Sequence, residues 1–122
     1  MGTPELETTL NRAVADGKKL LVTYLTAGLP SSKEFLELVT QLSEVSDAIE
    51  VGIPFSDPVM DGPVIQDAST KAIEAGVTPA VSLDLLEEAA AQVSTPLVVM
   101  TYFNPIHRMG EAQFADRLAG AG

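Results

Sequence analysis

The sequence predicts an α/β fold in which parallel strands alternate with helices, as in part of a (β/α)8 (TIM) barrel. Three short runs, 20–26, 47–52 and 96–102, are predominantly apolar on both sides, and a helical pattern follows each. Such strands are typical of parallel sheets, whose crossover helices cover the sheet. No glycine-rich dinucleotide fingerprint follows the first strand, so a barrel is favoured over a doubly wound sheet.

An amphipathic helix precedes the first strand, over residues 5–16. Its apolar side chains are spaced at i, i+4, i+7 and i+8, at Leu6, Leu10, Ala13 and Val14. We expect this helix to end near Gly17. After the first strand, Ser31 and Glu34 form a capping box, which predicts the start of a second helix that continues to about Leu42.

The second strand leads into a proline-rich loop over 53–63 and then into two helices. The first of these, over 63–76, begins with a proline, which suits the first position of a helix. Apolar spacing predicts another helix over 79–93 and a last one over 111–118. The segment between the third strand and this last helix contains His107 and is expected to be a polar loop.

These elements amount to an N-terminal helix and three βα units. Eight units close a barrel. We therefore expect residues 1–122 to be the N-terminal part of a single barrel domain, truncated before the fourth strand. The edge of the third strand would expose Val98, Val99 and their backbone groups unless another strand pairs with it.

Composition excludes several classes of function. The 122 residues include 17 acidic and 7 basic side chains, for a net charge of -10. This charge repels nucleic acids and anionic membrane surfaces. With no cysteine and one histidine, the chain has no pattern for a disulfide or a transition-metal site. No apolar run is long enough to span a membrane, so a cytoplasmic location is expected.

Glu50 is the one acid inside the apolar second strand. Alternate residues of a strand share a face, so Glu50 points into the barrel if Ile49 and Val51 meet the helices. Its same-face neighbours Ala48 and Gly52 are small, which leaves room for a ligand. Functional residues of barrels lie at the carboxyl ends of strands, and a carboxyl group there can give and take protons. The alternative is a carboxylate that simply reaches solvent.

Other candidates have structural alternatives. Asp57 and Asp61 both precede turn-forming residues, and this spacing alone favours a role in turns. Ser56 has no nearby histidine to activate it, so it is not expected to be a nucleophile. Tyr24 and Tyr102 stand near strand ends, where they either wall a pocket for an aromatic substrate or pack in the core.

The string Glu50-Val-Gly-Ile-Pro-Phe-Ser-Asp-Pro-Val-Met-Asp-Gly-Pro-Val-Ile-Gln66 resembles, nearly position for position, the signature of the tryptophan synthase alpha subunit family. Tyr24-Leu-Thr-Ala-Gly28 and Met100-Thr-Tyr-Phe-Asn-Pro105 are also similar to segments of that family, in the same order. The resemblance covers essentially the whole chain. It implies a (β/α)8-barrel lyase of tryptophan biosynthesis, which cleaves indole-3-glycerol phosphate to indole and glyceraldehyde 3-phosphate by a retro-aldol reaction.

The resemblance also assigns roles to four side chains. By analogy with the family, Glu50 is the general acid and base. Asp61 interacts with the indole N–H and stabilises the positive charge that develops on the ring. Tyr24 and Tyr102 match positions that line the indole end of the pocket.

A partner is implied as well. Asp57, Pro58, Asn104 and Pro105 match surfaces that meet the beta subunit in an α2β2 heterotetramer. That partner uses pyridoxal phosphate to join indole to serine, whereas the alpha chain carries no cofactor and no metal. The family's phosphate-binding loops fall after residue 122. Two alternatives therefore stay open: an inactive fragment that retains only the beta-binding surface, and a stand-alone indole-3-glycerol phosphate lyase.

Overall fold

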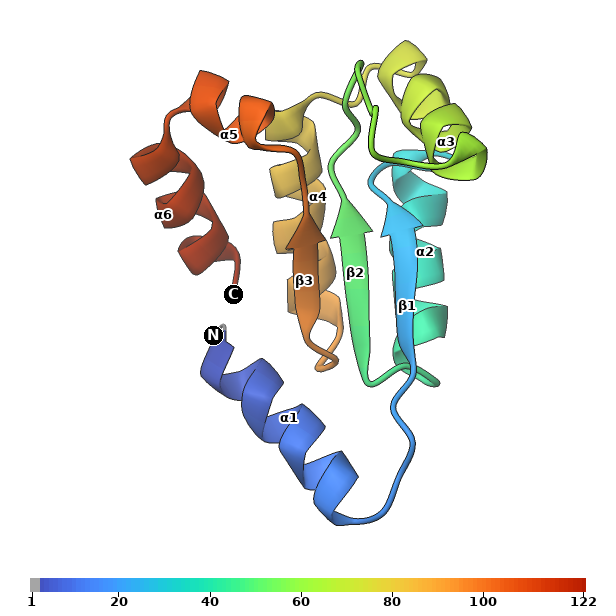
Figure 1. Ribbon diagram of the computed structural model, residues 1–122, viewed down its shortest axis with the longest axis vertical. Helices are drawn as coiled ribbons and strands as arrows, with labels where there is room; N and C mark the ends of the chain where they lie inside the picture. The colour runs from blue at the N-terminus through green and yellow to red at the C-terminus, as the bar shows by residue number, and fades with distance from the viewer. Residues whose placement is uncertain (1–2) are drawn as a thin grey trace.

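Strands and helices alternate along the chain in the computed structural model, which describes residues 3–122 (Figure 1). The elements in order are α1 (Thr3–Ala15), β1 (Val22–Thr26), α2 (Ser32–Ser43), β2 (Ala48–Gly52), α3 (Pro63–Glu74), α4 (Pro79–Gln92), β3 (Leu97–Met100), α5 (Phe103–Met109) and α6 (Glu111–Ala121). None of the helices formed by residues 3–122 has the length and apolar character needed to cross a membrane.

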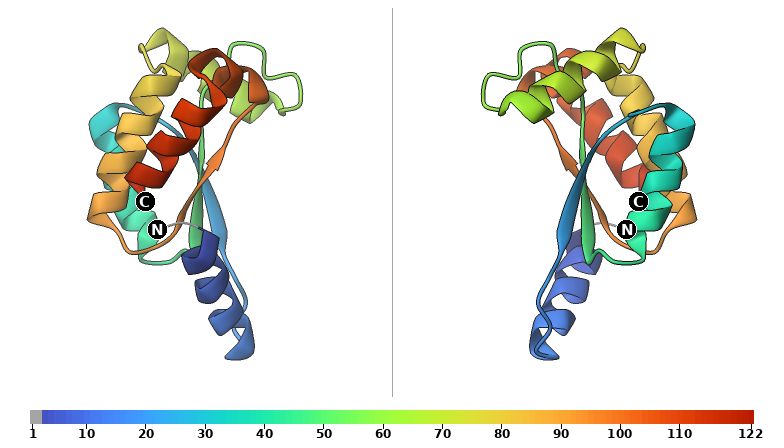
Figure 2. Two further views of the ribbon diagram at one scale, coloured as in Figure 1. Left: turned by 90° about the vertical axis from the view of Figure 1, so that its left-hand side faces the viewer. Right: turned by 90° about the vertical axis from the view of Figure 1, so that its right-hand side faces the viewer.

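The three strands form one parallel sheet in the order β1-β2-β3. Helices α2, α4 and α6 lie on one side of this sheet, α3 lies near the carboxyl ends of the strands, and α1 lies beyond the amino ends (Figure 2). A doubly wound sheet carries helices on both sides, whereas a barrel wall adds strands in sequence with every crossover helix on the outside. The predicted fold class, an α/β segment of a (β/α)8 barrel, is confirmed.

The hydrophobic core lies between the sheet and the three helices on its covered side. Ile49 and Val51 of β2 are completely buried in it. The helices contribute Phe35 and Val39 from α2, Leu83, Leu86 and Ala89 from α4, and Phe114 from α6. Because neighbouring residues of a strand point to opposite faces, Glu50 lies on the other face, as the alternation predicted.

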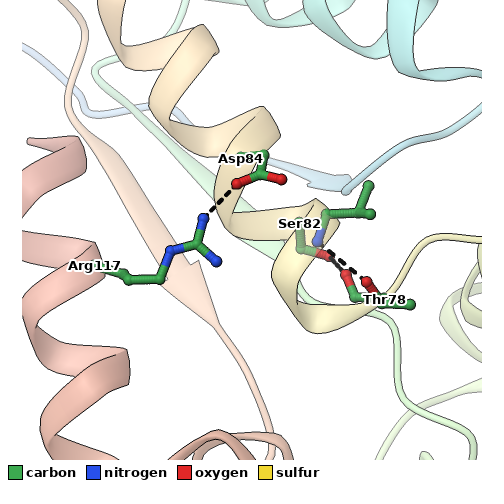
Figure 3. Close-up of polar contacts among 5 residues, drawn as sticks. Thr78, Ser82, Asp84 and Arg117 are labelled. Atoms are coloured by element: carbon green, nitrogen blue, oxygen red, sulfur yellow. Dashed lines mark hydrogen bonds and ion pairs between the residues drawn. The ribbon is translucent and has the colours of Figure 1, made fainter.

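Helix α6 is joined to α4 by a charged contact outside this core. The guanidinium group of Arg117 forms an ion pair with the carboxylate of Asp84 (Figure 3). Nearby, the hydroxyl group of the buried Ser82 donates to the carbonyl of Thr78 at 2.9 Å, so its burial leaves no unpaired polar group. The Thr78 hydroxyl also accepts from the Val81 N–H at 3.2 Å and caps α4.

One predicted segment is wrong. His107 does not lie in a loop, because residues Phe103–Met109 form α5. This helix has seven residues, too few to show a repeated apolar pattern in the sequence. Its proline, Pro105, stands in the first turn, where the missing N–H would have had no intrahelical partner.

Ser31 caps α2, and its removal is expected to destabilise the fold. The Ser31 hydroxyl accepts from the Glu34 N–H at 3.2 Å and donates to Glu34 Oε2 at 2.8 Å. Replacing Ser31 with alanine should lower the free energy of unfolding by about 1 kcal/mol, measured by urea denaturation. The matched control is Ser32→Ala one residue later, outside the cap position. Equal effects of both changes would contradict the capping role.

Candidate functional site

A cavity of about 280 Å³ opens at the carboxyl ends of the strands. It is lined by Tyr24, Gly52, Ile53, Met60, Asp61, Ser69, Met100, Thr101 and Tyr102. Tyr24, Gly52 and Met100 belong to the sheet face that Glu50 shares, since Tyr24 pairs with Glu50 while Gly52, two residues after Glu50, pairs with Met100. The cavity therefore occupies the end of the sheet where barrel proteins carry their functional residues.

Glu50 lies beside this cavity without lining it. It stands in the middle of β2, not at the carboxyl end of the strand as expected, because β2 continues to Gly52; it lies opposite Tyr24 of β1 and Val98 of β3 and is partly buried. Gly52, two residues nearer the carboxyl end of the strand, is the β2 residue that lines the cavity. Glu50 thus stands on the same sheet face as Gly52, one row of residues nearer the amino ends of the strands.

The pKa of the Tyr24 hydroxyl is affected by the other predicted site residues. Burial raises the pKa of Tyr24, and the hydrogen bond with Thr26 Oγ1, at 3.2 Å, opposes part of that rise. The negative charges of Asp61 and Glu50, together with Tyr102, raise the pKa of Tyr24 further. Three other sequence-predicted residues, from a second strand, a loop and the start of α5, therefore lie near enough to Tyr24 to affect its pKa.

Gly52 provides the space that Tyr24 occupies. A Cβ atom at position 52 would lie 2.7 Å from Cζ and 2.9 Å from Cε2 of Tyr24, and closer still to its hydroxyl oxygen. Carbon atoms in ordinary contact are about 3.5–4.0 Å apart. The room that small neighbours were expected to leave for a ligand above Glu50 is therefore partly filled by the Tyr24 side chain.

The loop after β2 is held in place by Gln66 and Tyr102. The Gln66 side chain donates to the carbonyls of Pro58, at 3.2 Å, and Asp61, at 2.8 Å. The Tyr102 hydroxyl accepts from the Met60 N–H at 3.0 Å. These contacts connect the loop to α3 and to the end of β3, and they hold Asp61 at the edge of the cavity.

A second cavity, of about 470 Å³, lies between the beginning of this loop, the α3–α4 connection and α5. Asn104 and Pro105, two of the residues expected at a partner surface, line it together with Arg108. The other two expected partner residues, Asp57 and Pro58, line neither cavity. Asp57 is exposed and accepts a hydrogen bond from the Ser56 hydroxyl at 3.0 Å.

Sequence reasoning missed two polar side chains of the site. Thr26 is buried at the end of β1 and binds the Tyr24 hydroxyl. Ser69 is buried on α3 and lines the cavity. Ser69 stands between Ile65 and Ala72 at helical spacing, so a small polar residue within an apolar stripe was the signal that could have found it. Among the side chains that the structure describes, residues 6–122, no group of His, Asp or Glu could hold a metal ion.

Titration of Tyr24 is expected to report this arrangement. The Tyr102→Phe chain has Tyr24 as its one remaining tyrosine, since the sequence contains two. Its ionisation, followed by ultraviolet absorbance, should have a midpoint above the ordinary tyrosine pKa of about 10. Asp61→Asn and Glu50→Gln should each lower the pKa of Tyr24, because each removes a negative charge that raises it.

The same shift has a consequence for stability. In the pH range in which the folded chain keeps the Tyr24 proton and the unfolded chain has lost it, the free energy of unfolding falls as the pH rises. The stabilisation is therefore complete below about pH 10 and is lost as pH rises through the raised pKa of Tyr24. Glu37→Gln, on the exposed surface of α2, is the control. If Glu50→Gln and Asp61→Asn shift the midpoint of the Tyr24 absorbance titration no more than Glu37→Gln does, the proposed proximity of the two carboxylates to Tyr24 is wrong.

The chain is similar to known proteins of one family over nearly its whole length. The family model described as tryptophan synthase alpha chain matches residues 10–122. A tryptophan synthase alpha chain from Deinococcus radiodurans is 39% identical over 121 residues, which cover 99% of this chain and 45% of the relative. One from Carboxydothermus hydrogenoformans is 46% identical over 107 residues, which cover 87% of this chain and 40% of the relative.

The similarity extends to the backbone. A crystal structure of tryptophan synthase from M. tuberculosis, in an aminoacrylate-bound form, matches with a TM-score of 0.90 and 39% sequence identity. The match covers 97% of this chain and 48% of that chain. The chain therefore spans about half the length of the curated relatives and the solved structure that it matches.

Proposed function

The chain belongs to the tryptophan synthase alpha chain family, and from this premise we propose that it forms part of an alpha subunit that cleaves indole-3-glycerol phosphate to indole and glyceraldehyde 3-phosphate. Residues 1–122 would be the N-terminal part of its single barrel domain. The observation that carries the proposal is a cavity at the carboxyl ends of the strands that Tyr24, Asp61 and Tyr102 line, with Glu50 one residue row away on the same sheet face and both carboxylates near enough to raise the pKa of Tyr24.

In the proposed reaction, Glu50 acts as general acid and then as general base. It delivers a proton to the indole carbon that carries the glycerol chain, and it removes the proton of the adjacent glycerol hydroxyl group. The bond between these two carbons then breaks, its electron pair returns to the ring, and the hydroxyl carbon becomes the aldehyde of glyceraldehyde 3-phosphate. Glu50 has the same protonation state before and after the cycle.

Asp61 and the two tyrosines would bind the indole ring. Protonation of the ring places positive charge on it, and a carboxylate beside the ring N–H stabilises that charge in the transition state. Asp61 lies at the cavity edge, where Gln66 and Tyr102 hold its loop. Tyr24 and Tyr102 supply aromatic walls, which suit a flat apolar ring.

We further propose that a beta subunit binds the surface that includes Asp57, Pro58, Asn104 and Pro105. This partner would carry pyridoxal phosphate, and the α2β2 complex would act in the cytoplasm. Asp57 and Asn104 are exposed and Pro58 is partly exposed, so a protein partner could reach these three residues, whereas Pro105 is buried where it lines the second cavity.

The test is indole release from indole-3-glycerol phosphate by the complete alpha chain that contains this segment, measured by chromatography. We expect slow release by the alpha chain and faster release when a beta subunit is added. No indole from a folded alpha chain, with or without the partner, would refute the proposed function. Release that the beta subunit does not change would favour a stand-alone lyase.

A second candidate function is a partner-binding segment without catalytic activity. One observation favours it: Glu50, the proposed catalyst, does not line the cavity at the carboxyl ends of the strands. Co-elution of the 122-residue chain with a beta subunit in size-exclusion chromatography, without indole release, would support this candidate. Failure to co-elute would count against it.

A further inference from the structure

The chain contains two Asp–Gly sequences, at 16–17 and 61–62. The backbone nitrogen of the residue after an aspartate can attack the side-chain carboxyl group and close a five-membered succinimide ring. Glycine favours this attack because it has no Cβ atom to hinder the approach. A hydrogen bond on the attacking N–H opposes the reaction, since the nitrogen must lose that proton.

The structure distinguishes the two sequences. The Gly17 N–H donates to the carbonyl of Val14 at 2.9 Å, where the chain leaves α1. The Gly62 N–H has no acceptor among the side chains of residues 6–122 or the backbone of 3–122, and the Asp61 carboxylate forms neither a hydrogen bond nor an ion pair there. A Cβ atom built at Gly62 meets nothing within 4 Å, so the surroundings of this glycine are open.

A neighbouring contact also favours the reaction at Asp61. The carbonyl of the Asp61–Gly62 peptide accepts a hydrogen bond from Gln66 Nε2 at 2.8 Å. When the Gly62 nitrogen loses its proton, the negative charge spreads to that carbonyl oxygen, because the peptide group is conjugated. A donor at the oxygen stabilises this anion and so makes the Gly62 N–H more acidic.

We propose that Asp61–Gly62 is a site of spontaneous isomerisation in the folded chain, at which Asp61 becomes isoaspartate. The Gly62 nitrogen forms a bond to Cγ of Asp61, the bond between Cγ and the carboxyl OH breaks, and the amide proton leaves with that OH as water. Water then opens the ring at either carbonyl. Opening at Cγ restores aspartate, and opening at the backbone carbonyl gives isoaspartate, with no net change in mass and no oxidant or reductant.

The isomerised residue has a different shape. The main chain then runs through Cβ and Cγ, which adds a carbon to the backbone, and the free carboxylate is attached directly to Cα. The carboxylate of Asp61 is thereby moved relative to Tyr24 and the cavity. A loss of catalytic activity with age depends on the proposed function of Asp61, whereas the isomerisation itself does not.

The test compares both sequences in one molecule. The 122-residue chain is aged in buffer and in concentrated urea, and trypsin then releases peptide 13–18 with Asp16 and peptide 34–71 with Asp61. Isoaspartate in each peptide is measured with protein isoaspartyl methyltransferase and chromatography. In urea the two sequences should react at similar rates. In buffer, isoaspartate at Asp61 should exceed that at Asp16 several-fold.

Gly62→Ala is the variant that isolates the chemistry. The position is open and its φ of -76° suits alanine, so the fold should be retained, as circular dichroism would check. Isoaspartate should fall several-fold at Asp61 and stay unchanged at Asp16. The proposal would be overturned if the ratio of isoaspartate at Asp61 to isoaspartate at Asp16 were the same in buffer as in urea, or if Asp16 reacted faster in buffer. The measurement counts isoaspartate and not turnover, so a failure of the proposed enzymatic function would not affect these outcomes.

Discussion

Replacing Glu50 with glutamine in the complete alpha chain is expected to lower kcat for indole release by about 10²–10⁴-fold, the usual contribution of a general acid or base. Glutamine keeps the size and the hydrogen-bonding ability of the side chain but cannot exchange a proton. The fold should be unaffected, because Glu50 lies on the sheet face opposite the core residues Ile49 and Val51. Steady-state kinetics with indole-3-glycerol phosphate, and circular dichroism for the fold, would measure both effects.

The pattern of the kinetic change is as informative as its size. A group that acts in the transition state changes kcat and kcat/KM together and leaves KM nearly unchanged. Glu87→Gln on the exposed surface of α4 is the matched control and should have normal kinetics. Normal turnover by Glu50→Gln would remove Glu50 from the mechanism, and a rise in KM alone would make it a binding residue.

Gly52→Ala is expected to lower the free energy of unfolding by about 1–3 kcal/mol, the usual cost of overpacking. The added methyl group would lie 2.7 Å from Cζ of Tyr24, so the ring has to leave its position. The movement would also break the 3.2 Å hydrogen bond between the Tyr24 hydroxyl and Thr26. Urea denaturation measures the change in stability, and the absorbance titration of Tyr24 reports whether its surroundings have changed.

A double-mutant cycle isolates this contact. In a Tyr24→Ala chain the three atoms nearest to the new methyl group, all from the Tyr24 side chain, are gone, so Gly52→Ala should cost far less than in the unchanged chain. Gly120→Ala in α6 is the control, because a Cβ atom there meets nothing within 4 Å and alanine favours a helix. The same cost in both Tyr24 backgrounds would show that Gly52 is needed for another reason.

The cap of α2 shows how far local patterns extend. The Ser31 hydroxyl caps the Glu34 N–H as the sequence predicts, although the Glu34 carboxylate accepts from that hydroxyl and not from the Ser31 N–H; a cap is predictable because its residues are close together in the chain. The face on which Glu50 lies was predictable for a similar reason, since alternation along a strand is a local rule. Helix α5 was not predictable, because its seven residues are too few to repeat an apolar pattern.

From sequence alone one could derive the order of strands and helices apart from α5, the parallel α/β class, the face of Glu50 and, through a long matching string, the family. Three-dimensional packing added the contacts that make a site: Tyr24 filling the space at Gly52, and Tyr102 binding the backbone of Met60. The two residues of each pair are far apart in the sequence: Tyr24 contacts Gly52, and Tyr102 contacts Met60. Local propensities are set by neighbours in the chain, whereas such contacts depend on strand register and on how the loops pack.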